Sequence, residues 1–208
     1  MKNFINTKNR TALMVARIQP LHFGHCRIID RMIRNYEKVI LCIGSSQKSR
    51  ERWDPYTFEE RKKMVQNVYG ARIKIVQLND LGTTEGTTDW AEYVTNKITK
   101  IGMAEPTDYF TGSLADSRWY TSKFFLEGVS TWNESDQTSA QIQPGNEAYY
   151  SNGVMKLLHI VDRDKNQVPS ATELRTFMEL NQDDWKEWIP AVNWEIVDEN
   201  FPKEFRVG

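Results

Sequence analysis

The chain has 208 residues, of which 39% are hydrophobic and 26% charged, so it can form a packed core and does not have the composition of a disordered protein. Its 27 basic and 28 acidic residues nearly cancel, which gives no support for a nucleic-acid partner but leaves room for a local phosphate pocket. No apolar run approaches the ~20 residues of a membrane span, and residues 1–10 lack a signal-peptide core. We therefore expect a cytoplasmic protein with no membrane partner.

Apolar runs alternate with amphipathic stretches along most of the chain. We expect buried strands at five apolar runs: 12–16, 39–43, 73–76, 109–112 and 157–161. We expect helices where apolar residues recur at helical spacing: after residue 25, after the capping-box pattern Thr57–Glu60, around 90–98 and from Ser170, resuming near Pro190. This alternation predicts an α/β fold, Rossmann-like and doubly wound, with a mainly parallel sheet.

We expect residues 1–208 to form one domain, interrupted by one insertion. Residues 130–153 are rich in Ser, Asn, Gln and Gly and are long for a connection, so we expect an insertion, either a mobile flap or a small hairpin. Residues 176–208 are the expected C-terminal helical region. Cys26 and Cys42 lack CxxC spacing and are expected to be buried thiols.

The strongest chemical signal is the run Arg17–His25, which follows the first expected strand and opens the first expected helix. This is where an open α/β sheet binds ligands, and the helix N-terminus favours an anion. Gly24 would let the backbone approach a phosphate, and His22 and His25 add donors. Two surface histidines or a zinc pair could give the same pattern. Zinc would need further Cys or His ligands, and the one remaining histidine, His159, lies on an apolar strand, where we expect it to be buried and hydrogen-bonded.

Three blocks in the same order resemble the archaeal type of nicotinamide-mononucleotide adenylyltransferases, a branch of the HxGH nucleotidyltransferase superfamily. Arg17–His25 is similar to the family's RxQPxHxGH signature. Ile43–Ser49, followed by Asp54–Arg61, resembles a second block, and Ser170–Arg175 resembles the [ST]xTxxR triphosphate motif. The resemblance implies adenylyl transfer from ATP to nicotinamide mononucleotide, giving NAD and pyrophosphate by in-line attack without a covalent intermediate.

The resemblance also implies roles for individual residues. Catalytic contacts with the phosphates fall to His22, His25, Arg17 and Arg175. Contacts with ATP fall to Ile18, Gln19, Gly24, Lys48, Arg52, Gly112, Arg118, Ser170 and Thr172. Contacts with the nicotinamide nucleotide fall to Asp80 and to Trp90, whose indole would stack on the pyridinium ring. No protein ligand to a metal is implied, because Mg²⁺ arrives with ATP.

Simpler explanations stay open for many of these residues. They are a solvated basic loop for Lys48–Arg52, turns for Asp80 and Gly112, a core stripe for Trp90, and helix caps for Ser170 and Thr172. Trp185 and Trp188 are expected in the core or in an interface. Relatives are commonly multimeric, so a homo-oligomer is compatible with the chain, although the sequence does not give the oligomeric state.

The chain departs from the family at Trp53, where relatives usually place an arginine before the Asp-Pro or Asn-Pro step. Either Arg50 or Arg52 supplies the missing positive charge, or the chain binds the triphosphate differently from the family. Two other functions therefore stay open. One is an HxGH nucleotidyltransferase with another acceptor, namely phosphopantetheine, FMN, or a sugar or alcohol phosphate, and the other is a nucleotide-binding protein with a degenerate site.

Overall fold

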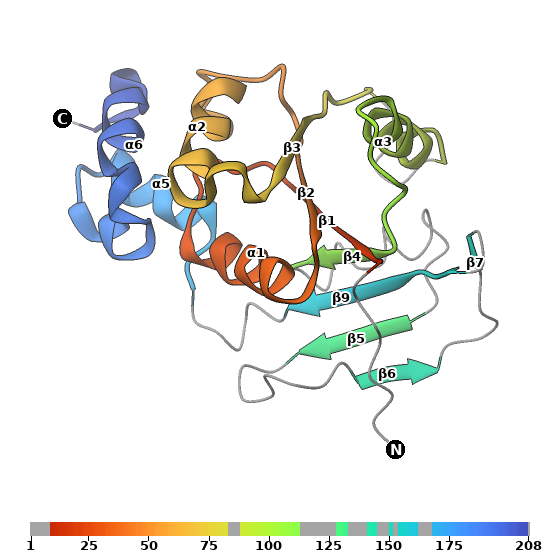
Figure 1. Ribbon diagram of the computed structural model, residues 1–208. Coiled ribbons are helices and arrows are strands. Elements are labelled where there is room, and N and C mark those ends of the chain that lie inside the picture. The colour runs from red at the N-terminus through yellow and green to blue at the C-terminus, as the bar shows by residue number, and fades with distance from the viewer. Residues whose placement is uncertain are drawn as a thin grey trace.

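A computed structural model describes residues 9–82, 88–112, 128–132, 141–144, 150–151, 154–161 and 168–207. For 88–91, for the described residues between 128 and 155, and for Val161, only the backbone is described. The described residues form a seven-stranded sheet with helices packed against both of its faces (Figure 1).

The main sheet and a separate two-stranded ribbon contain all the strands of the described residues. The strands of the main sheet are β1 (Thr11–Ala16), β2 (Lys38–Ile43), β3 (Lys74–Gln77), β4 (Asp108–Thr111), β5 (Gly128–Trp132), β6 (Gln141–Pro144) and β9 (Leu157–Val161). The ribbon pairs β7 (Tyr150–Ser151) with β8 (Val154–Met155). The helices are α1 (Phe23–Asn35), α2 (Phe58–Tyr69), α3 (Thr88–Lys100), α5 (Ala171–Glu179) and α6 (Trp194–Asn200). Short 3₁₀ segments are η1 (Gly70–Arg72), η2 (Asp183–Trp188), η3 (Ala191–Asn193) and η4 (Lys203–Phe205).

The strand order of the main sheet is β3-β2-β1-β4-β9-β5-β6. All neighbours run parallel except β6, which is antiparallel to β5 at the edge. The chain winds outward from β1 through β2 to β3 and then crosses back to β4 on the other side of β1. This reversal is the switch point of the sheet. Doubly wound sheets bind ligands at such a point, and we call the region at the carboxyl ends of β1 and β4 the crevice. The predicted fold class is confirmed.

Alternate residues of the central strands pack on opposite faces of the sheet. On one face, Met14 of β1 and Leu41 of β2 join a cluster with α1, α2, α5 and α6. On the other face, Leu13 and Cys42 pack with Val94 and other residues of α3. Complete burial of side chains of this size stabilises the fold by about 1.5–3 kcal/mol each. Strands covered on both faces explain the continuous apolar runs of the sequence.

Most of the expected elements are present within a residue or two of their predicted limits. The five predicted strands correspond to β1, β2, β3, β4 and β9, and the capping box before α2 forms as expected, with Thr57 and Glu60 bonded to each other's backbone N–H. Cys26, Cys42 and Trp185 are buried, as predicted. Within 130–153, part of β5, all of β6 and β7 are described and the rest lies outside the described residues. None of the described helices is long and apolar enough to cross a membrane.

A buried polar cluster closes the amino-terminal edge of the sheet, opposite the crevice. Asp108, the first residue of β4, accepts hydrogen bonds from Arg10 Nε (2.6 Å), Tyr36 Oη (2.8 Å) and Thr107 Oγ1 (2.8 Å), and lies 2.8 Å from His159 Nε2. All but Thr107 are buried. The prediction of a buried, hydrogen-bonded His159 is confirmed.

The Asp108 cluster predicts an acid-sensitive contribution to stability. Burial alone raises the pKa of the Asp108 carboxyl, but hydrogen bonds and charges from His159 and Arg10 outweigh burial and hold this pKa below its usual range. The resulting stabilisation is therefore complete above the unfolded-state pKa of about 3.9 and is lost as the pH falls through the lower folded-state pKa. We expect Asp108→Asn to lower the free energy of unfolding at pH 7 and to flatten its dependence on pH between about 5 and 2. Urea unfolding across this range checks the prediction, and parallel pH profiles of the two proteins would contradict it.

Candidate active site

The turn after β1 ends in a histidine that caps α1. His22 is fully buried with extended backbone, and its Nδ1 accepts a hydrogen bond from the backbone N–H of Gly24 (3.1 Å). Because Nδ1 accepts this hydrogen bond, a neutral His22 carries its proton on Nε2. The N-terminus of α1 therefore combines the positive end of the helix dipole with an oriented imidazole donor.

The second histidine lies directly against the first. The ring centroids of His22 and His25 are 3.9 Å apart, with the rings tilted by 40°. Gly24 permits this arrangement, because a Cβ there would lie 2.8 Å from Cε1 and 2.9 Å from Nδ1 of His22. The glycine is thus required by the capping imidazole, which is a reason that the sequence did not reveal.

Ile18 and Gln19, in the same turn, have buried side chains that contact other parts of the protein. Ile18 adopts a left-handed backbone conformation, with φ of 54°, and its side chain is buried in the core. The amide of Gln19 bonds twice to the backbone of Tyr56, donating to its carbonyl and accepting from its N–H, both at 3.0 Å. These contacts join the turn after β1 to the loop before α2. The predicted ATP contacts of Ile18 and Gln19 stay predictions.

The first and third sequence blocks meet at this turn. Arg175, on α5, is buried; its Nη1 donates to the carbonyl of Gln19 (2.7 Å) and its Nη2 to Thr172 Oγ1 (3.0 Å). Ser170 caps α5 and forms a capping box with Glu173. A guanidinium has five N–H donors, so these two contacts do not exhaust Arg175.

Two arginines and a buried carboxylate set the charge of the site. Arg17 has an exposed side chain, and its Nη1 lies 3.8 Å from Oδ1 of the buried Asp54. Burial lowers the pKa of Arg175, and repulsion from Arg17 adds to this lowering, whereas attraction to Asp54 opposes it. The mutual repulsion of Arg17 and Arg175 is relieved by any anion bound between them.

Arg61 is a site residue to which the sequence assigned no role. Its side chain is fully buried, and burial lowers its pKa to about 10. Nη1 donates to the carbonyls of Arg17 and Gly44, both at 2.9 Å, Nη2 to that of Ser45 at 3.2 Å, and Nε to that of Thr57 at 3.2 Å. Arg61 therefore fixes the carboxyl ends of β1 and β2 against α2.

The loop after β2 pairs two residues that were predicted to contact different substrates. Lys48 Nζ lies 3.1 Å from Asp80 Oδ2, while Ser45 Oγ donates to Asp80 Oδ1 at 2.9 Å. The backbone N–H of Asp80 donates to Gln47 Oε1 at 3.0 Å. Burial raises the pKa of Asp80, but hydrogen bonds from Lys48 and Ser45 outweigh it and lower this pKa overall. Lys48 and Asp80 thus lie together, as an ion pair.

The two arginines that precede Trp53, namely Arg50 and Arg52, both form ion pairs with glutamates. Arg50 binds Glu60 of α2 and donates to the carbonyl of Asn200 at the end of α6 (2.6 Å). Arg52 forms a two-point contact with Glu179 of α5, Nε to Oε1 at 3.0 Å and Nη2 to Oε2 at 2.9 Å. Arg52 is the more exposed of the two, and its partner Glu179 lies on the same helix as Arg175.

The remaining predicted residues lie at the other side of the crevice or beyond the described part. Gly112 follows β4, the strand next to β1 on the far side of the switch point. Arg118 lies outside the described residues, and so does the side chain of Trp90, whose backbone is in the first turn of α3. Among the residues that are described, no group of three His, Cys, Asp or Glu could hold a metal ion.

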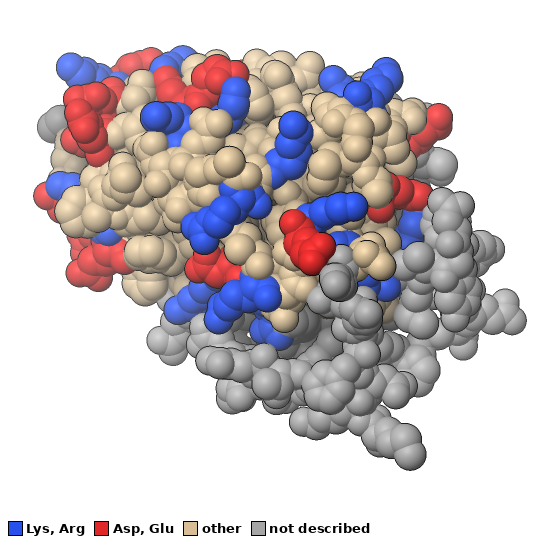
Figure 2. Space-filling view, in the orientation of Figure 1, with Lys and Arg blue, Asp and Glu red and all other residues tan. Residues whose placement is uncertain are grey.

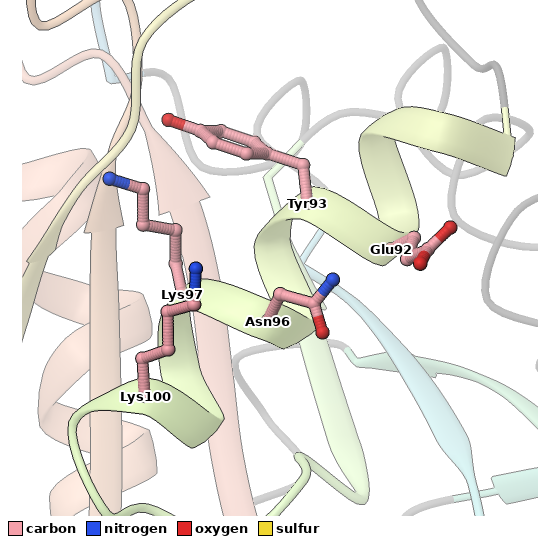
Figure 3. A pocket seen from close by; sticks show the side chains of 5 residues that line it. All are labelled: Glu92, Tyr93, Asn96, Lys97 and Lys100. Atoms are coloured by element: carbon pink, nitrogen blue, oxygen red, sulfur yellow. The ribbon is translucent and has the colours of Figure 1, made fainter.

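A hollow of about 280 Å³ lies along α3. Its lining consists of Glu92, Tyr93, Asn96, Lys97 and Lys100. In Figure 3 Tyr93 and Lys97 extend to the same side of the helix, whereas Glu92 points away. The Tyr93 hydroxyl accepts a hydrogen bond from the N–H of Asn79 at 3.0 Å, which ties α3 to the residue before Asp80. The hollow contains none of the predicted site residues.

Basic side chains are also common on the outer surface. Figure 2 shows Lys and Arg over α1 and beside it, with acidic side chains between them. Arg27 and Arg34 are exposed residues of α1. Surface charge alone therefore does not single out the crevice, which is distinguished by its buried His22, Arg61 and Arg175.

Comparisons with known proteins agree with this architecture. The chain is 28% identical over 148 residues to the nicotinamide/nicotinic acid mononucleotide adenylyltransferase of Acinetobacter baylyi, covering 69% of this chain and 77% of that protein. It is 27% identical over 195 residues to the nicotinamide-nucleotide adenylyltransferase of the archaeon Methanolobus tindarius, covering 91% and 88%. The resemblance found in the sequence is confirmed.

Solved structures share the fold at low sequence identity. One is a bifunctional NMN adenylyltransferase/ADP ribose pyrophosphatase from Francisella tularensis, crystallised with AMP and a manganese ion, with a TM-score of 0.57 and 18% identity over 92% of this chain. This chain covers 52% of that longer protein. Another is the Plasmodium falciparum nicotinic acid mononucleotide adenylyltransferase with NaAD, with a TM-score of 0.58 and 12% identity, covering 96% of this chain and 99% of that one. The cytidylyltransferase-like family matches residues 13–206, nearly the whole chain, and the protein therefore belongs to that family.

Proposed function

We propose that this protein transfers the adenylyl group of ATP to nicotinamide mononucleotide, forming NAD and pyrophosphate. The observation that carries the proposal is the His22–His25 pair at the N-terminus of α1, together with Arg175 of α5, which bonds to Gln19 in the same turn, next to the switch point of the sheet. This arrangement concentrates donors and positive charge where a polyphosphate would lie. The adenylyltransferase relatives in bacteria and archaea support the same reaction.

The proposed mechanism needs no covalent intermediate. A 5′-phosphate oxygen of nicotinamide mononucleotide attacks the α-phosphorus of ATP, and the bond between that phosphorus and the oxygen bridging to the β-phosphorus breaks in line as pyrophosphate leaves. His22 and His25 donate to the phosphate oxygens as negative charge shifts onto the leaving group. Arg17 and Arg175 hold the polyphosphate chain in position. No described residue of the chain is assigned to hold a metal; Mg²⁺ carried by ATP would neutralise part of the phosphate charge.

The other predicted contacts complete the proposal. We assign Gly24, Ser170, Thr172 and Gly112 to the binding of ATP. We assign Trp90 and Asp80 to the nicotinamide nucleotide. We also propose that residues 1–208 act as one catalytic domain, with 130–153 as an insertion.

The proposed reaction is tested with the purified protein, Mg·ATP and nicotinamide mononucleotide, following NAD and pyrophosphate together. Equal amounts of the two products support the proposal. Other phosphate acceptors, namely phosphopantetheine, FMN and sugar phosphates, are run in parallel with pyrophosphate release as the common readout. Pyrophosphate formation with one of these and not with nicotinamide mononucleotide would replace the proposed acceptor, and ATP binding without turnover on any acceptor would indicate a degenerate site.

A further inference from the structure

The departure from the family at Trp53 places an exposed aromatic ring beside two cations. The Trp53 side chain is 57% exposed, although it is among the largest apolar side chains of the protein. The guanidinium carbon of Arg175 lies 5.7 Å from the ring centroid and that of Arg52 lies 5.8 Å from it. These distances are within the range of cation–π attraction.

The ring adds to a set of contacts that already define the orientation of Arg175. The Arg175 guanidinium is bonded to the carbonyl of Gln19 and to Thr172 Oγ1, and Trp53 supplies a contact from the loop before α2. Arg52, the neighbour of Trp53 in the chain, is fixed to α5 through Glu179. The loop and α5 are thus joined by two contacts, one ionic and one aromatic.

An arginine at position 53 of this chain would lie next to two other arginines, Arg52 and Arg175. The Trp53 ring lies within 6 Å of two guanidinium groups, so a third guanidinium there would be repelled by both. An indole avoids this repulsion and attracts both cations.

We propose that Trp53 is a positioning residue that holds Arg175 for the triphosphate, so that an aromatic contact takes the place of the arginine that the resembling family usually has at this position. The inference rests on the proposed function, because it takes the triphosphate as the ligand of Arg175. It assigns no catalytic role to Trp53, which acts only through Arg175.

The test compares Trp53→Phe, Trp53→Ala and Trp53→Arg with the wild-type protein. Binding of Mg·ATP is measured by calorimetry, and KM for ATP and kcat are measured in the adenylyl-transfer assay. Loss of a cation–π contact of this kind is expected to weaken ATP binding by about three- to thirtyfold in Trp53→Ala, with a matching rise in KM and a smaller change in kcat. Trp53→Phe keeps a ring and should stay within about threefold of wild type.

The Trp53→Arg variant distinguishes two explanations for the tryptophan at position 53: either the ring positions Arg175, or the chain lacks a cation there. If the aromatic ring positions Arg175, Trp53→Arg binds ATP no better than Trp53→Ala; if the chain simply lacks a cation, Trp53→Arg binds ATP at least as tightly as wild type, which would overturn the inference. Trp194→Ala removes another exposed tryptophan, from α6, and should leave ATP binding unchanged. Unchanged binding in Trp53→Ala overturns the inference alone, whereas a wild-type protein that does not bind Mg·ATP overturns the proposed function with it.

Discussion

We expect His22→Asn and His25→Gln each to lower kcat for adenylyl transfer by about 100- to 1000-fold, the effect of removing one oriented donor from a charge-stabilising site. The two rings are 3.9 Å apart at the N-terminus of α1, so each can donate to a phosphate in the crevice. Initial rates of NAD formation at saturating ATP and nicotinamide mononucleotide measure the loss.

Asparagine is chosen at position 22 so that a loss of catalysis is measured without a loss of the helix cap. His22 caps α1 through Nδ1, and an asparagine side chain can accept the same hydrogen bond from Gly24. His22→Ala additionally loses the cap, which costs about 1 kcal/mol of stability. Phe23→Ala, at the exposed position between the histidine and the glycine, is the matched control and should keep its activity. Near-normal kcat in both histidine variants would remove the phosphate role.

The largest loss of stability is expected for Arg61→Met. The substitution keeps an apolar stem of similar length but leaves the buried or partly buried carbonyls of Arg17, Gly44 and Ser45 without the guanidinium that now binds them. A buried polar group that loses its partner costs about 1–3 kcal/mol. Because two of the three carbonyls are only partly buried, we take about 1–2 kcal/mol for each, so the free energy of unfolding should fall by about 3–6 kcal/mol. Urea unfolding followed by far-UV circular dichroism measures the change.

A neighbouring cation gives the comparison for Arg61. Lys63 lies on the same helix with an exposed side chain, and Lys63→Met should change the free energy of unfolding by less than about 0.5 kcal/mol. If Arg61→Met lost no more than Lys63→Met, the contacts of Arg61 with the ends of β1 and β2 would not be important for stability.

The parts of this fold that were predictable from the sequence depend on local patterns. Residues 39–43 form a continuous apolar run because β2 is covered on both faces, and Thr57 and Glu60 form their capping box within one helical turn. The edge pair β5 and β6 was expected only as part of a polar insertion, because few aliphatic side chains mark these strands.

The internal contacts of the candidate site were not predictable in the same way. Gln19 bonds to the backbone of Tyr56, and Arg61 bonds to four backbone carbonyls, and such contacts leave no residue pattern because every residue carries a carbonyl. The motif Ser170–Arg175 predicted an anion site, but the contact of Arg175 with Trp53 depends on how α5 packs against a distant loop. Asp108 had no predicted role, because its partners come from three separate segments.

The central claim is that the crevice between β1 and β4 holds the triphosphate of ATP at the N-terminus of α1. A crystal structure of the wild-type protein with Mg²⁺, a non-hydrolysable ATP analogue and nicotinamide mononucleotide tests it most directly. We expect phosphate oxygens within hydrogen-bond distance of His22, His25 and Arg175, with the mononucleotide phosphate in line with the α-phosphorus. A triphosphate bound elsewhere, with no contact to either histidine, would contradict it.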